Sequence, residues 1–100
     1  MPNFQESVFE LTKKIPKGKV STYREIANVL GKPTASRAVG NALNKNTSPS
    51  VPCHRVVRSD GFVGGFRSGT SRKIELLRSE GIRIEGGKIM NFRSVLFKFD

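Results

Sequence analysis

The sequence has very few of the side chains from which disulfide and metal sites are built. Its 100 residues include one cysteine, Cys53, one histidine and no tryptophan. A single cysteine forms no internal disulfide, and one cysteine with one histidine falls short of the four ligands of a structural zinc site. We therefore expect no metal site, and Cys53 is either a buried bystander or a reactive thiol.

Long apolar segments are also absent. No hydrophobic run approaches the roughly 18 residues that a membrane-spanning helix needs. The N-terminus lacks the order of charged, apolar and small residues that is typical of a signal peptide. We therefore expect an intracellular, cytoplasmic protein with no membrane partner.

Acidic side chains are scarce. The chain has 8 Asp and Glu against 18 Lys and Arg, which gives a formal net charge of +10. This excess of positive charge predicts a polyanionic partner, with association at the nucleoid as the expected setting. Hydrophobic residues make up 36% of the chain, an ordinary globular share. A chain of 100 residues closes one core, so we expect a single domain over 1–100.

The first half of the sequence predicts three helices. Asn3 with Glu6 and Thr22 with Glu25 have the spacing of a capping box, which marks two helix starts. A tight connection at 31–33 separates the second helix from the third. The expected helices cover 3–14, from Thr22 to Gly31, and 34–44, the last beginning at Thr34. Two short helices across a glycine-bearing turn indicate a helix-turn-helix.

The second half of the sequence predicts shorter elements than the first half. The pair Val56-Val57 predicts a short buried strand or a turn, and the glycines of 62–69 predict a loop. A fourth helix is expected over 71–80, followed by a hairpin of 82–85 and 88–90 around two glycines, and a tail over 92–99 that packs on the core. The expected fold is mainly α, a winged-helix-like helix-turn-helix domain with a small C-terminal β-hairpin.

The neighbours Cys53 and His54 are a weak signal when taken alone. A thiol is nucleophilic only as its thiolate, and an adjacent histidine can promote that form. Residues next to each other in sequence do not always face each other, so a buried cysteine beside a satisfied histidine is the other interpretation.

The residues around Cys53 resemble a known active-site signature. The run Pro52-Cys53-His54-Arg55-Val56-Val57 is similar to that of the O6-alkylguanine-DNA alkyltransferases, the methylated-DNA–protein-cysteine methyltransferases. The resemblance covers roughly residues 3–85 and matches the C-terminal catalytic domain of that family. Four further segments follow in family order: 21–27 (STYREIA), 36–40 (SRAVG), 61–66 (GFVGGF) and 76–81 (LLRSEG).

The resemblance implies a reaction that the protein performs once. A damaged guanine is flipped out of duplex DNA and Cys53 takes its alkyl group by direct displacement, without a cofactor. By the family's pattern, His54 deprotonates Cys53 through a water and Glu80 orients His54. Tyr23 matches the tyrosine that donates a proton or hydrogen bond to the leaving base.

The resemblance also implies how the chain binds double-stranded DNA, as a monomer and through the minor groove. Arg37 matches the arginine that enters the base stack and fills the space of the flipped nucleotide. The other polar residues on that face of the third helix are expected to contact the DNA with Tyr23; they are Ser36, Asn41 and Lys45. Small residues at Ala38, Gly40 and Ala42 are compatible with a shallow groove.

The expected substrate pocket departs from the family pattern in several places. Asn46 matches the asparagine that couples the recognition helix to the Cys-His turn, although the chain is one residue shorter between Asn46 and Pro52. Phe66 stands where many members have a tyrosine, and Arg67 replaces a small residue at the lip. The remaining expected pocket residues are Pro52, Val56 and Leu43. Most members carry an additional N-terminal domain, which we do not expect here.

Two other functions fit part of the sequence. Alkyltransferase-like proteins keep the fold, the tyrosine and the arginine and bind alkylated bases, but they typically replace the cysteine. A winged-helix regulator explains the charge and the helix-turn-helix, with Cys53 in the core, and leaves the Pro-Cys-His-Arg run unexplained. A cysteine hydrolase is disfavoured because nothing in the sequence indicates an oxyanion hole.

Overall fold

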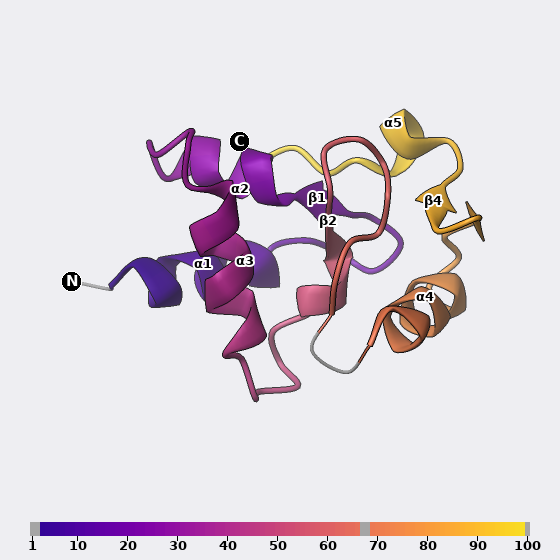
Figure 1. The fold of residues 1–100 in the computed structure, drawn as a ribbon, viewed down its shortest axis with the longest axis horizontal. Coiled ribbons are helices and arrows are strands. Elements are labelled where there is room, and N and C mark those ends of the chain that lie inside the picture. Colours follow the sequence, from indigo (N-terminus) through magenta and orange to yellow (C-terminus); the bar gives the residue numbers. More distant parts are fainter. Residues whose placement is uncertain (1–2, 67–68, 100) are drawn as a thin grey trace.

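The computed structural model describes residues 3–66 and 69–99 and is mainly helical, as the sequence predicts. Three helices, α1 (Phe4–Lys13), α2 (Tyr23–Val29) and α3 (Ser36–Asn44), pack together on one side of the molecule (Figure 1). Helix α4 (Thr70–Ser79), the hairpin and α5 (Phe92–Val95) lie on the other side. Within the described ranges, no helix has the length and apolar character needed to cross a membrane.

The two predicted capping boxes begin their helices through side-chain hydrogen bonds. Asn3 Oδ1 accepts from the Glu6 amide at 2.8 Å, and Thr22 Oγ1 accepts from the Glu25 amide at 2.9 Å. The predicted start of the third helix at Thr34 is wrong. A turn in which the Ala35 amide donates to the Lys32 carbonyl holds Thr34 outside the helix, and α3 begins at Ser36 without a side-chain cap.

The predicted hairpin is present in a shorter form. Strands β3 (Ile84–Glu85) and β4 (Lys88–Ile89) are antiparallel, with Ile84 opposite Ile89. Gly86 and Gly87 between them have φ values of 58° and 77°, a left-handed pair that glycine adopts without strain and that suits a two-residue turn.

A parallel strand pair joins the two sides of the molecule. Strand β1 (Ser21–Thr22) pairs with β2 (Val56–Val57), with Ser21 beside Val56. Neighbouring residues of a strand point to opposite faces. Val56 accordingly belongs to the core cluster of α1, α2 and α3, whereas Val57 belongs to the cluster beneath α4 and the hairpin.

Two further segments complete the fold: the tail after α5 and the short turn before β2. The tail after α5 runs back toward α2, and Phe97 and Phe99 pack on the helical cluster with their rings edge to face (Figure 1). A 3₁₀ turn, η1 (Cys53–Arg55), leads directly into β2. The single cysteine is therefore held at the junction of two packed clusters.

Candidate active site

A wide cavity opens beside η1 and the start of α3. Its volume is about 1690 Å³. Its lining comes mainly from α3, η1, the loop before η1 and the loop after β2, with one residue each from α1, α2 and α4. Most of the residues singled out from the sequence line it: Tyr23, Ser36, Arg37, Asn41, Leu43, Asn46, Pro52, Cys53, His54 and Phe66.

Three of the expected site residues lie away from this cavity, and a fourth cannot be placed. Val56 is fully buried in the helical core, so the expectation that it lines the pocket is wrong. Lys45 is exposed and lines an adjoining groove beside α1. Glu80 caps α4 behind His54, and Arg67 lies outside the described residues.

Cys53 is half-buried, and its sulfur is held by polar groups at the end of α3. Asn46 Nδ2 donates to Sγ at 3.1 Å, and Sγ lies 3.7 Å from the Leu43 carbonyl. Burial raises the pKa of the Cys53 thiol, and the Asn46 hydrogen bond and the Lys73 charge offset part of that rise. The thiol is therefore mainly protonated at neutral pH, and any reaction in which it acts as a nucleophile requires a base.

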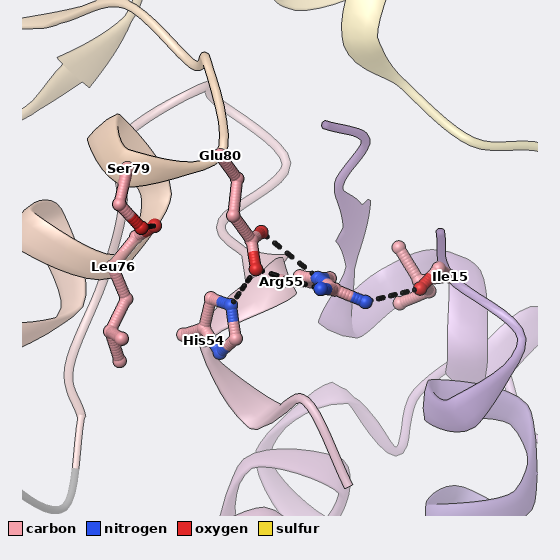
Figure 2. A network of polar contacts seen from close by, with 6 residues as sticks. All are labelled: Ile15, His54, Arg55, Leu76, Ser79 and Glu80. Carbon is pink, nitrogen blue, oxygen red and sulfur yellow. Dashed lines mark hydrogen bonds and ion pairs between the residues drawn. The ribbon is translucent and has the colours of Figure 1, made fainter. Parts of the chain in front are cut away.

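A network of Glu80, His54 and Arg55 connects the cysteine turn η1 to the end of α4 and to the chain after α1 (Figure 2). One oxygen, Oε2, lies 2.9 Å from His54 Nε2, and both carboxylate oxygens accept from Arg55, at 2.9 Å from Nε and 2.7 Å from Nη2. Arg55 Nη1 donates to the Ile15 carbonyl at 2.9 Å. Burial alone would raise the pKa of Glu80, but the hydrogen bonds from Arg55 and His54 outweigh it and hold that pKa below its ordinary value.

The Glu80 contact sets the orientation of the His54 ring. A neutral imidazole that donates from Nε2 to a carboxylate carries its proton there and keeps Nδ1 as the acceptor. Sequence reasoning assigned no role to Arg55, although it stands inside the Cys-His run. Its bidentate pair with Glu80 is the arrangement that arginine favours with a carboxylate.

Lys73 is a second residue beside the site to which the sequence analysis assigned no role. Its side chain is fully buried, and Nζ donates to the Val56 carbonyl at 2.7 Å, to the Gly65 carbonyl at 3.1 Å and to the Tyr23 hydroxyl at 3.2 Å. A signal was present, because Lys73 precedes the buried Leu77 by four residues and shares its helix face.

The exposed face of α3 carries the polar residues expected to contact DNA. Arg37, Asn41 and Lys45 are exposed, and Ser36 is half-buried at the start of the helix. Ala42 is 5% exposed and packs in the helical core, so the expectation that it lies on the groove face is wrong. No group of three His, Cys, Asp or Glu side chains among residues 3–66 and 69–99 is arranged to ligate a metal.

The sequence matches a family model over the region that builds this site. Residues 3–82 match the model described as 6-O-methylguanine DNA methyltransferase, DNA binding domain. The chain belongs to this family. Like other family members it has a mainly helical DNA-binding domain, and it is related to alkyltransferases of DNA repair.

Curated relatives and solved structures agree with this membership. The methylated-DNA–protein-cysteine methyltransferase of Methanosarcina acetivorans is 49% identical over 79 residues, which are 78% of this chain and 51% of the relative. The chain spans 22% to 51% of the length of the curated relatives that it matches.

Two solved structures extend the comparison to DNA complexes. Atl1 of S. pombe, bound to damaged DNA containing O6-carboxymethylguanine, is 34% identical with a TM-score of 0.86, over 98% of this chain and 99% of Atl1. Mycobacterium tuberculosis OGT in complex with DNA is 40% identical with a TM-score of 0.76, over 81% of this chain and 50% of OGT.

Proposed function

We propose that this family member repairs duplex DNA by moving an alkyl group irreversibly from O6-alkylguanine onto Cys53. The observation that carries the proposal is the position of Cys53 in the cavity beside α3, with the His54 and Glu80 pair directly behind it. A thiol kept for packing alone needs neither a cavity nor an oriented imidazole.

The side chains support one balanced displacement. His54 Nδ1 takes the thiol proton through a water, since Nε2 is occupied by Glu80. The thiolate forms a bond to the alkyl carbon while the bond from that carbon to O6 breaks, and the electron pair leaves with the guanine. Tyr23, which lines the same cavity, donates a proton to the departing base. The product thioether is stable, so each molecule reacts once.

We propose that α3 approaches the base from the minor groove of the duplex, with its exposed polar face against the DNA. A formal net charge of +10 favours the phosphate backbone, and Ser36, Asn41 and Lys45 are polar groups placed to contact it. Arg37 is exposed and lines the cavity, and we expect its planar guanidinium to fill the stack once the base has left. We propose that the protein acts as a monomer.

The test is the mass of the intact protein after incubation with duplex DNA that contains O6-methylguanine. The expected result is a gain of one methyl group per molecule, which peptide mapping places on Cys53. An otherwise identical duplex with guanine is the control and gives no gain. Tight binding to the damaged duplex without any mass gain contradicts the proposal.

Replacement of Arg37 by alanine is expected to slow transfer from duplex DNA by about 10-fold, because the flipped state loses the side chain that fills the stack and unstacking a base costs a few kcal/mol. Reaction with a free O6-alkylguanine base should be unchanged, since no stack is involved. The two rate constants are measured side by side with Lys45→Ala as a control for a phosphate contact. An equal loss on both substrates contradicts the role given to Arg37.

A second candidate function is recognition of alkylated DNA without transfer. One observation favours it: Atl1, solved with damaged DNA, matches this chain over nearly the full length of both proteins. The mass experiment distinguishes the two functions, because recognition alone leaves Cys53 unmodified.

A further inference from the structure

Lys73 has a set of partners that matches its charged form. An ammonium group carries three N–H donors. Lys73 Nζ has three oxygen acceptors within 3.2 Å: the carbonyls of Val56 and Gly65 and the hydroxyl of Tyr23. A buried charge is tolerated only where its hydrogen bonds are made, and here each donor has one acceptor.

The charged form of Lys73 decides where the hydroxyl proton of Tyr23 points. When Tyr23 Oη accepts from the ammonium, its own hydrogen needs another acceptor. The Gly65 carbonyl is 3.5 Å away, too far for a strong bond, and already accepts from Lys73. Because Tyr23 lines the cavity, the hydrogen is available to a base bound there.

The neutral form of Lys73 reverses this arrangement. A neutral amine has two N–H donors and one lone pair. The two carbonyls use both donors, and the lone pair then accepts the hydroxyl hydrogen of Tyr23. The hydroxyl becomes a donor to Lys73 and no longer a donor to the cavity.

Burial places the change between these forms near neutrality. It lowers the pKa of Lys73 to about 7, and the charge of Cys53 acts in the opposite direction. Tyr23 is the titratable group that faces Lys73 from α2, and Cys53 is the one from η1, whereas β2 and the loop after it present carbonyl oxygens. Burial, together with Cys53, raises the pKa of Tyr23, so Tyr23 alone is a weak acid.

We propose that Lys73 is a positioning residue for the transfer, acting through Tyr23: its ammonium directs the Tyr23 hydroxyl proton toward the damaged base and resupplies that proton when the base leaves. This inference rests on the proposed function. As the bond from the alkyl carbon to O6 breaks, the Tyr23 proton goes to the guanine and a Lys73 proton goes to the tyrosinate. The proton of Cys53 has already moved to His54. In total, Cys53 and Lys73 each lose one proton, and His54 and the guanine each gain one.

The test compares methyl transfer by wild type and Tyr23→Phe across pH. The ratio of their second-order rate constants isolates the hydroxyl, because effects of pH on Cys53 and on DNA binding are common to both proteins. We expect the rate constant of wild type divided by that of Tyr23→Phe to fall by about 10-fold between about pH 6 and pH 8.5. The fall corresponds to the loss of one hydrogen bond in the transition state as Lys73 becomes neutral. A ratio that is constant over this range overturns the inference.

A second comparison tests whether Lys73 acts through the tyrosine. In a Lys73→Met background, Tyr23→Phe should change the rate less than about 2-fold at any pH. The hydroxyl can then donate to the Gly65 carbonyl, which Lys73 no longer occupies, and no ammonium resupplies its proton. An undiminished Tyr23→Phe effect in that background also overturns the inference. The wild-type comparison needs no change at Lys73 and stands even if Lys73→Met does not fold. Absence of methylation in wild type at every pH refutes the proposed function instead.

Discussion

Replacement of Cys53 by serine is expected to abolish alkyl transfer and to leave binding of the damaged duplex intact. A serine hydroxyl is a far weaker nucleophile than a thiolate near neutral pH, so the rate constant should fall by at least ~1,000-fold. The serine oxygen can still accept from Asn46 and donate toward Leu43, the two contacts that hold the sulfur. The fold and the DNA-binding surface should therefore be preserved.

Two measurements check this expectation on the same samples. The intact mass after prolonged incubation with the O6-methylguanine duplex reports transfer. The dissociation constant for that duplex reports binding. We expect this constant to lie within about 2-fold of the wild-type value because the exposed face of α3 is unchanged. Methylation of the Cys53→Ser protein contradicts the assignment of the nucleophile. A large loss of affinity in the Cys53→Ser protein contradicts the expectation that Cys53 acts in transfer and is not needed for binding of the damaged duplex.

Replacement of Glu80 by glutamine is expected to weaken both the fold and the reaction. The Glu80 and Arg55 side chains are only 10% and 16% exposed, and the substitution leaves the guanidinium without its anionic partner, which costs about 3 kcal/mol of unfolding free energy at neutral pH. The His54 ring also loses its charged acceptor, and transfer should slow by about 100-fold.

The effect on stability should depend on pH with a defined sign. The pKa of Glu80 is lowered in the folded protein, so its stabilisation is fully present above the ordinary pKa of about 4.3 and is lost as the pH falls through the folded value. The difference in unfolding free energy between wild type and Glu80→Gln, measured in urea, should therefore shrink below that pH.

Glu75 on the same helix provides the matched control. Its side chain is 62% exposed, and its Oε1 lies 3.8 Å from Arg72 Nη1. Because ion pairs in solvent contribute little to stability, Glu75→Gln should change the unfolding free energy by less than ~0.5 kcal/mol. Equal effects of the two substitutions would falsify the role assigned to the Glu80 network.

The helical half of the fold was predictable because its signals are local. The side chains of Asn3 and Thr22 cap the amides of residues three positions later, which is visible in the sequence and present in the structure. The pairing of β1 with β2 was not predictable. Each strand has two residues, and Ser21 meets Val56 across 34 intervening positions, so no local pattern marks the pair.

The candidate site was predictable where residue type and motif agree. The order of the family motifs identified Cys53, His54 and Tyr23, and the structure brings these three residues together around one cavity. Lys73 was missed because lysine is rarely fully buried, so its type suggests solvent. Val56 was misplaced because the four residues before it in the motif line the cavity, whereas its own side chain lies in the helical core.

The strand pair has a consequence for how the reactive sulfur is prepared. Cys53 lies three residues before Val56 and four before Val57, and these two valines are fixed in different cores. A movement of the cysteine turn must therefore disturb one packed core or the other, which close packing resists. The position of the sulfur is therefore set during folding, and under the proposed function the alkylated base reaches a nucleophile that is already in place.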